Sequence, residues 1–319
     1  MGHRFGQGGI RGLITNTEVP FFRIMLEEAG QAYQIFTDHG PLELLRSVSR
    51  YTNRQYFYRR YGYEFNKTGT TILDEDWDNL IILDACRYDS FSEYNTLKGM
   101  LESRVSRGST SKQFIWGNFA NRSALDTVYI SDNPWYGKLC ERINAELHDF
   151  SFCERDAFDG IVSYPSTVTD SAIDFADNYP RKRLIVHYMQ PHAPYFDTNG
   201  EEVCRWPENP GPKTVRTAYT NNLKLVLEEV DRLVDQLVGK TVISADHGEL
   251  LGERLLPIPL RQYQHPRGIY VEELVKVPWF VIDGGERKEI ERAPRSQRGP
   301  LDESLTQDIN DQLAGLGYL

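Results

Sequence analysis

Acidic residues and histidines stand just after several apolar runs of the sequence, where they could bind a metal ion. Asp84 ends the run NLIILD, and Asp246 and His247 follow the run TVISA. His192 follows a third apolar run, RLIVHY, and His265 lies in a polar stretch. Carboxylates and imidazoles together can hold a hard or borderline divalent ion. We therefore expect Asp84, Asp246 and His247 to form a metal site.

A hydroxyl-rich stretch could supply the nucleophile that such a site would serve. The sequence SRGSTSKQF places Ser109, Thr110 and Ser111 before a predicted helix that starts near Lys112. A hydroxyl at a helix N-terminus lies near free backbone N–H groups and the positive end of the helix dipole. That environment stabilises an attacking oxyanion and an anionic phosphate or sulfate ester. Thr110 or Ser109 could attack, or Thr110 could serve only as the helix N-cap.

Alternating strands and helices are needed to bring these residues together. Short apolar runs predict strands at 79–84, 126–130, 183–188, 241–245 and 277–282. Apolar residues spaced three and four apart predict helices at 111–119, 134–148, 169–178 and 217–238. This order predicts an α/β sandwich with a central, mostly parallel sheet covered by helices on both faces. The candidate residues would then meet at the carboxyl edge of the sheet.

The same sequence features divide the chain into three segments. We expect a helical N-terminal arm over 1–70, a catalytic core over 71–285, and a connector with a C-terminal helix over 286–319. Gly40-Pro41 should break the arm into two helices. Residues 44–63 of the arm hold five arginines and no acid, with six aromatic residues interleaved. The aromatics could pack on the core, or this stretch could contact an anionic membrane or a partner protein.

Composition excludes some classes of function. The chain has 319 residues and a net charge of −10, and its acidic body argues against nucleic-acid binding as the main role. It holds no apolar run long enough to span a membrane. Its four cysteines are scattered, which does not indicate a zinc cage or a disulfide framework. We therefore expect a cytoplasmic protein that could lie peripherally at the membrane.

Five blocks of the sequence, in order, resemble the alkaline-phosphatase-like superfamily, specifically its sulfatase and lipoteichoic-acid-synthase-like branch. The blocks are NLIILDACRYD, GSTSKQF, HYMQPHAPY, SADHGE and QHPRGIYVEELVKVPWFVI. The ending DQLAGLGY is similar to the tail of many sulfatase-like proteins. The resemblance covers about residues 77–319. It implies a metal bound by Asp84, Thr110, Asp246 and His247, with Thr110 as the nucleophile.

The chain also departs from parts of this superfamily. Formylglycine sulfatases need a C/S-x-P-x-R motif, and SRGSTSKQF has no such Pro and Arg. Members with two zinc ions use an acid where this chain has Gln190. We therefore expect one divalent ion. Two carboxylates, an imidazole and a hydroxyl suit Mn or Zn, and suit Ca or Mg less well because of the imidazole.

The function implied is a metal-dependent hydrolase or transferase that acts on an anionic phosphoester, such as that of a glycan or lipid-linked substrate. Thr110 would attack phosphorus and form a covalent intermediate. His192 and His265 would bind the ester oxygens or protonate the leaving group. Arg87 could bind an ester oxygen or pair with Asp89. A sulfuric-ester hydrolase and a catalytically silent binding scaffold are the alternatives.

Overall fold

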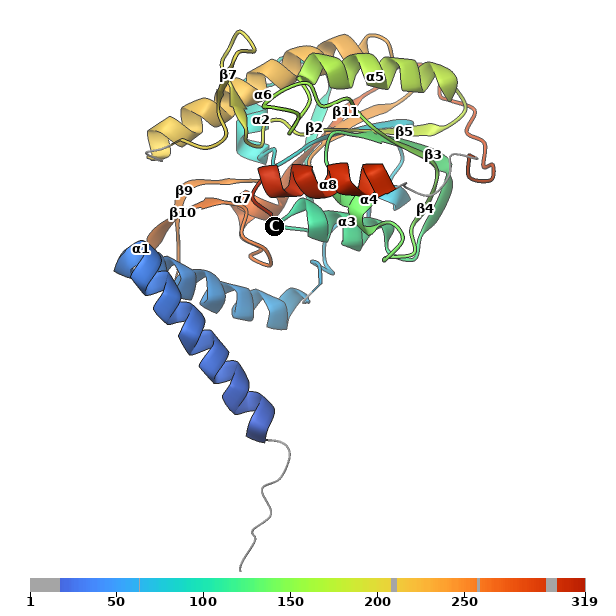
Figure 1. The fold of residues 1–319 in the computed structure, drawn as a ribbon. Helices are drawn as coiled ribbons and strands as arrows, with labels where there is room; N and C mark the ends of the chain where they lie inside the picture. The colour runs from blue at the N-terminus through green and yellow to red at the C-terminus, as the bar shows by residue number, and fades with distance from the viewer. Residues whose placement is uncertain (1–17, 63, 208–210, 257–258, 297–302, 319) are drawn as a thin grey trace, which may run out of the picture.

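The chain folds into three layers, with helices on both faces of a seven-stranded sheet (Figure 1). This computed structural model describes residues 18–62, 64–207, 211–256, 259–296 and 303–318. The layers confirm the α/β sandwich expected from the sequence. Strands buried on both faces need a covering layer on each side, and the five residues of β1 (Asn79–Leu83) are all buried.

Six of the seven strands run in the same direction. The order across the sheet is β2 (Met100–Val105), β11 (Lys276–Ile282), β8 (Thr241–Ser244), β1, β5 (Arg183–Tyr188), β3 (Ser123–Ser131) and β4 (Glu146–Phe152). β11 is antiparallel to both of its neighbours, and the strands from β8 to β4 pair in parallel. The carboxyl ends of β8, β1, β5 and β3 therefore lie side by side at one edge.

Two apolar cores lie on opposite faces of the sheet, because successive residues of a strand point to opposite sides. Ile81 and Leu83 face the core formed with α5 (Pro165–Asn178) and α6 (Pro212–Val234). Leu80 and Ile82 face the core formed with α3 (Ser111–Phe119), α4 (Trp135–Leu139) and α8 (Glu303–Gly315). Figure 1 shows α5 and α6 above the sheet and α3, α4 and α8 below it.

Short elements complete the fold. They are η1 (Ile72–Asp74), α2 (Tyr88–Tyr94), β6 (Tyr195–Phe196), β7 (Glu202–Cys204), β9 (Leu250–Leu255), β10 (Leu260–Gln264) and α7 (Glu272–Val275). β9 and β10 form an antiparallel hairpin that follows the strand end carrying Asp246 and His247. The hairpin leads the chain from one side of the candidate site to His265.

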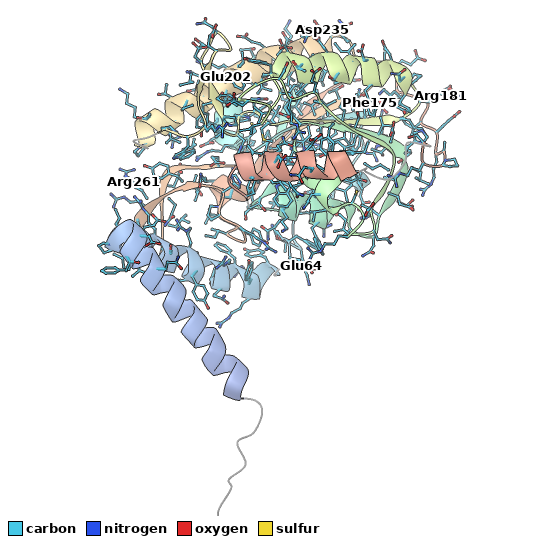
Figure 2. All side chains as sticks on the ribbon, viewed as in Figure 1. Glu64, Phe175, Arg181, Glu202, Asp235 and Arg261 are labelled. Atoms are coloured by element: carbon cyan, nitrogen blue, oxygen red, sulfur yellow. The ribbon has the colours of Figure 1, made fainter. Side chains whose placement is uncertain are left out.

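The N-terminal arm is the helix α1 (Glu18–Tyr61), which is bent at Gly40 (φ 80°, ψ 177°). The bend agrees with the break expected at Gly40-Pro41. The second half of α1 lies against the β9–β10 hairpin, and Phe57 packs with Ile269 and Tyr270. Figure 2 shows Arg261 of the hairpin close to the bend of the arm. Within the described residues, no helix is both long enough and apolar enough to cross a bilayer.

The helix expected at 134–148 is wrong over most of its length. α4 contains five residues only, and β4 follows it as an edge strand paired with β3. Asn144 takes a left-handed conformation (φ 51°), which ends any helical path before β4. In β4 itself, Leu147 and Asp149 are buried while Glu146 is exposed, so its first residues alternate with the period of a strand.

Candidate active site

Three buried side chains converge where β1 and β8 end. Single ligand atoms of Asp84, Asp246 and His247 lie within 4.8 Å of one another. Nε2 of His247 is 3.6 Å from Oδ1 of Asp84 and 3.3 Å from Oδ2 of Asp246. Both of these carboxylate oxygens are buried and lack a hydrogen-bond partner. Buried oxygens without a donor are costly, so their convergence favours a bound cation.

The remaining polar atoms of these side chains are fixed by neighbours. Nδ2 of Asn133 donates to Oδ2 of Asp84 at 2.6 Å, and the backbone N–H of Ala85 donates to Oδ1 of Asp246 at 3.1 Å. Nδ1 of His247 lies 2.9 Å from the carbonyl oxygen of the next residue, so Nδ1 donates and Nε2 keeps its lone pair. Each candidate ligand is thus oriented by one atom and presents another to the centre.

The loop after β1 is held under backbone strain. Ala85 takes a left-handed conformation (φ 62°), which is uncommon for a residue with a Cβ. The hydroxyl of Tyr219, on α6, donates to the carbonyl oxygen of Ala85 at 2.8 Å and accepts from the N–H of Arg87 at 2.9 Å. This buried hydroxyl therefore stabilises the turn that follows Asp84.

Charge at the centre also favours a cation. Burial raises the pKa of Asp84 well above its usual value, and the negative charge of Asp246 raises it further. Burial acts in the same direction on Asp246, but the neighbouring histidines and the hydrogen bonds to this carboxyl together outweigh it and lower its pKa. Burial lowers the pKa of His247. Two carboxylates and a neutral imidazole in a buried space suit a divalent ion with mixed O and N ligands.

Two neighbouring hydroxyls at the start of α3 have different surroundings. Oγ of Ser111 lies 3.3 Å from both Oδ2 of Asp84 and Nε2 of His247. Thr110 is the N-cap of α3, and its Oγ1 accepts from the N–H of Gln113 at 3.3 Å. Ser111 is 1% exposed, whereas Thr110 is 9% exposed and lines a pocket. The hydroxyl of Ser111 therefore lies beside the carboxylate cluster, whereas Thr110 lines the pocket and its hydroxyl caps α3.

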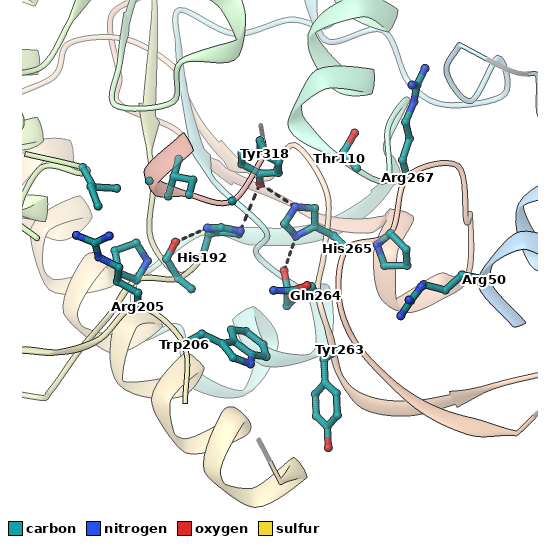
Figure 3. A pocket seen from close by; sticks show the side chains of 18 of the residues that line it. Arg50, Thr110, His192, Arg205, Trp206, Tyr263, Gln264, His265, Arg267 and Tyr318 are labelled. Atoms are coloured by element: carbon teal, nitrogen blue, oxygen red, sulfur yellow. Dashed lines mark hydrogen bonds and ion pairs between the residues drawn. The ribbon is translucent and has the colours of Figure 1, made fainter. Parts of the chain in front are cut away.

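A pocket of about 620 Å³ opens beside this cluster (Figure 3). Thr110, His192 and His265 are among the residues that line it. Cationic side chains from three separate segments also line it: Arg50 of the arm, Arg205, and Arg267. The C-terminal tail forms part of its wall through Gly315, Leu316, Gly317 and Tyr318.

His192, Glu249 and His265 form a second group of buried side chains of ligand types, within 4.8 Å of one another. Nδ1 of His265 lies 2.9 Å from Oε2 of Glu249, and Nε2 of the same ring lies 2.8 Å from the hydroxyl of Tyr318. The two ring nitrogens point in opposite directions. An ion held between His192 and the Nε2 of His265 therefore cannot also take Glu249, which serves instead to orient His265.

Burial sets the protonation of this second group. It lowers the pKa of His192 and of His265 to about 4, so both rings are neutral at neutral pH. It raises the pKa of Glu249 to about 7. Neutral imidazoles offer lone pairs to the pocket and carry no positive charge for an anionic ester.

Arg87 does not reach the pocket, in contrast to the substrate-binding role expected for it. Its guanidinium lies 2.6 Å from Asp89 and 2.7 Å from Glu253, and it donates to the carbonyl oxygen of Glu249 at 3.0 Å. The two carboxylates and the carbonyl oxygen occupy the donors of the guanidinium. The alternative of a pairing with Asp89 describes the structure, and Arg87 acts here by holding the backbone of Glu249.

Four residues of the site were not singled out from the sequence: Ser111 as a neighbour of the carboxylates, Asn133, Glu249 and Tyr318. Asn133 follows β3, so the strand-end rule that finds Asp84 could also have found it. Glu249 and Tyr318 lie inside the motifs SADHGE and DQLAGLGY, but their roles depend on the hairpin and on the turn after α8. No pattern in the sequence indicates those placements.

No protein-family model and no curated protein matches the chain. One similar solved structure is the soluble domain of lipooligosaccharide phosphoethanolamine transferase A from Neisseria meningitidis, with 14% identity, a TM-score of 0.44, and coverage of 63% of this chain and 75% of that one. Another is the C-terminal periplasmic domain of EcEptC from Escherichia coli in complex with Zn (13%, TM-score 0.44, coverage 78% and 85%). A third is a protein in the alkaline phosphatase superfamily from Vibrio parahaemolyticus (11%, TM-score 0.42, coverage 81% and 72%).

The expected cytoplasmic location is wrong, because a similar structure is a periplasmic domain. The expectation came from four cysteines without paired spacing, and all four are free thiols here. A chain with two large apolar cores needs no disulfide to fold, so free thiols do not define a compartment. The superfamily that the five sequence blocks resemble is also the one named for a similar structure.

Proposed function

We propose that this chain is a metal-dependent hydrolase or transferase that acts on a phosphoester, with Thr110 as its nucleophile. One observation carries the proposal: buried, unpartnered oxygens of Asp84 and Asp246 converge with Nε2 of His247 at the carboxyl edge of the sheet. A binding scaffold would have no need of two buried carboxylates held in this arrangement. Because the likenesses to solved structures are distant, the proposal rests on this geometry and on the sequence motifs.

The residues present fit a divalent ion. Asp84, Asp246 and His247 would hold it, and Oγ of Ser111 lies where a fourth oxygen donor is needed. Mn or Zn suits this mixed O and N set best. When bound, the ion supplies positive charge that lowers the pKa of a nearby hydroxyl and offsets charge on the ester oxygens.

Thr110 is better placed than Ser111 to attack a substrate. Thr110 lines the pocket, whereas the hydroxyl of Ser111 is enclosed between Asp84 and His247. The first N–H groups of α3 have no partners within the helix, so they can donate to the oxygens of a phosphoryl group held at its N-terminus. Attack by Thr110 would form a phospho-threonine, which water or an acceptor hydroxyl then resolves.

The pocket beyond Thr110 would receive the rest of the ester. His192 and His265 present neutral Nε2 atoms to it, and Arg50, Arg205 and Arg267 line its walls. Positive side chains in a partly enclosed pocket attract an anionic substrate and hold it in place. The chain lacks the formylglycine motif, so we favour a phosphoester over a sulfate ester as the group attacked.

Metal content and activity measured together test the proposal. The purified protein would be assayed on p-nitrophenyl phosphate, bis(p-nitrophenyl) phosphate and p-nitrophenyl sulfate, each with Mn, Zn, Mg and Ca. We expect turnover of a phosphoester and a lower kcat/KM for the sulfate. Asp246→Ala should lose both the metal and the activity while the fold stays intact. Undiminished stoichiometric metal in Asp246→Ala contradicts the ligand assignment.

The nucleophile is tested by three neighbouring variants. Thr110→Ala should lose at least about 10³-fold in turnover, because no other group replaces the covalent step. Ser109→Ala should lose much less, and Ser111→Ala should lose less than Thr110→Ala while it weakens metal binding. An active Thr110→Ala protein beside an inactive Ser109→Ala or Ser111→Ala protein shifts the nucleophile to that serine.

A further inference from the structure

The C-terminal tail turns back toward the site at the end of α8. The N–H of Tyr318 donates to the carbonyl oxygen of Leu313 at 2.8 Å, and the N–H of Gly317 donates to that of Ala314 at 3.0 Å. Gly317 has φ 79°, the left-handed conformation that glycine adopts freely. These two bonds form a Schellman motif, which fixes the direction of the chain after a helix. The last turn of α8 therefore aims Tyr318 at a defined point.

That point lies between the two histidines of the pocket (Figure 3). The hydroxyl of Tyr318 is 2.8 Å from Nε2 of His265 and 3.5 Å from Nε2 of His192. Its ring packs edge-on against Trp135 of α4, with ring centroids 5.6 Å apart. A ring held by a neighbouring aromatic and a hydroxyl held by imidazole leave this side chain little freedom.

Hydrogen-bond partners show where the protons of the group lie. Nδ1 of His192 bonds to the carbonyl oxygen of Ala193, which can only accept, so this Nδ1 carries the proton. Nδ1 of His265 faces the carboxylate of Glu249 and carries its proton in the same way. The Nε2 atoms of both neutral rings therefore carry no proton. Of the groups described around them, Tyr318 is the one with a proton to give at this point.

We propose that Tyr318 is a further catalytic residue, which protonates the leaving group of the phosphoester and then takes a proton from the attacking water. This assignment rests on the proposed function of the site. The sequence left His192 and His265 either to bind the ester oxygens or to protonate the leaving group, and this assignment gives the second role to a residue of the C-terminal tail. Between turnovers, the two histidines hold the phenol in place by accepting a hydrogen bond from its hydroxyl.

The proton and bond changes balance over one cycle. Thr110 enters as the alkoxide, having lost its proton to solvent. Its Oγ1–P bond forms as the bond from phosphorus to the leaving oxygen breaks, and that oxygen takes the proton of Tyr318. Water then attacks phosphorus and gives a proton to the phenolate as the Oγ1–P bond breaks. Phosphate leaves, and Thr110 alkoxide and Tyr318 phenol are restored.

The surroundings of Tyr318 suit an acid for a poor leaving group. Burial raises the pKa of its phenol well above 10, and nearby carboxylates raise it further. The phenol thus stays protonated at neutral pH. A weak acid of this kind helps most when the leaving oxygen is a strong base, as an alkoxide is, and helps little when the oxygen is a weak base such as p-nitrophenolate.

That difference supplies the test. Tyr318→Phe removes the proton and keeps the ring against Trp135. Its turnover would be measured on p-nitrophenyl phosphate and n-butyl phosphate, or on the corresponding methyl diesters where the protein prefers them. We expect a loss of about 10²- to 10⁴-fold on the butyl ester and a loss of a few-fold on the p-nitrophenyl ester. Tyr164→Phe, which removes a tyrosine hydroxyl bonded to Glu202 rather than to these histidines, is the matched control.

Each other outcome decides against the assignment. Equal losses on both esters show that Tyr318 acts by positioning, and a gain on both shows that the tail blocks the pocket. No loss on either ester shows that the phenol has no part in the reaction. Wild-type protein that turns over neither ester, with any metal, refutes the proposed function and this assignment with it. Active wild type with equal losses refutes the assignment alone.

Discussion

Replacing Tyr219 by phenylalanine should weaken metal binding from a distance. Its hydroxyl bridges the carbonyl oxygen of Ala85 and the N–H of Arg87 on either side of the strained turn that follows Asp84. Tyr219→Phe leaves both buried backbone groups without this partner. An unsatisfied buried polar group costs roughly 1–3 kcal/mol, so for two such groups we expect a loss of about 2–6 kcal/mol in the free energy of unfolding.

The same change should alter the site. Asp84 precedes the turn, and the N–H of Ala85 also binds Oδ1 of Asp246. A relaxed turn therefore disturbs both carboxylates, and we expect metal affinity to fall by about 10- to 100-fold, as is typical when a residue that orients a ligand is lost. Urea unfolding of metal-free protein gives the stability, and calorimetric titration with Mn²⁺ and Zn²⁺ gives the affinity.

A second buried tyrosine separates the two effects. Tyr188 lies at the end of β5, and its hydroxyl bonds to Oγ1 of Thr169 at 2.8 Å. Its backbone carbonyl oxygen accepts from the N–H of Asp84, and the substitution leaves that bond in place. Tyr188→Phe should lower stability and leave metal affinity unchanged. If Tyr219→Phe also binds metal as tightly as wild type, the hydroxyl of Tyr219 stabilises the fold without positioning Asp84, and the reasoning is refuted.

Three further predictions concern stability and the arm. Burial raises the pKa of Asp132 from 3.8 to about 7, so the stability that its protonated form contributes is lost as pH rises from about 4 through 7. Relative to wild type, the free energy of unfolding of Asp132→Asn should therefore rise by about 1.4 kcal/mol per pH unit across this window. If urea unfolding shows that the stabilities of the two proteins change in parallel with pH, the prediction is contradicted. Phe57→Ala should cost about 3–5 kcal/mol in unfolding free energy, because Phe57 is 9% exposed. If residues 44–63 also contact anionic lipid, replacing Arg54 and Arg59 by glutamine should reduce co-sedimentation with anionic vesicles at low salt, and full-length protein that ignores such vesicles excludes a lipid contact.

The central sheet was predictable because several of its strands have a recognisable pattern in the sequence. NLIIL, RLIVHY and TVIS are short apolar runs, and all but the first residue of RLIVHY are buried. Buried parallel strands need such continuous runs, and polar residues just after them must lie at the sheet edge. That logic is sufficient to bring Asp84, Asp246 and His247 together. The same logic did not predict the edge strand β4, because its first residues alternate between exposed and buried and follow a five-residue helix.

The division of roles between Thr110 and Ser111 was beyond sequence reasoning. Successive residues at a helix start differ by about 100° in direction, so Ser111 lies against the carboxylates while its neighbour Thr110 lines the pocket. Which of the two faces which depends on how α3 meets the sheet. Residue type alone treats Ser109, Thr110 and Ser111 as equivalent candidates.

The origin of each group suggests that metal binding and proton transfer can be separated by mutation. The proposed ligands follow β1 and β8, which pair directly in the sheet, so the strand register fixes their spacing. Tyr318 instead comes from a tail that packs, through α8, on the core formed with α3 and α4. Changes in the tail should therefore alter the reaction without releasing the metal, whereas changes at the strand ends should abolish both. A tail variant that lost its metal would show that the two halves of the site support each other.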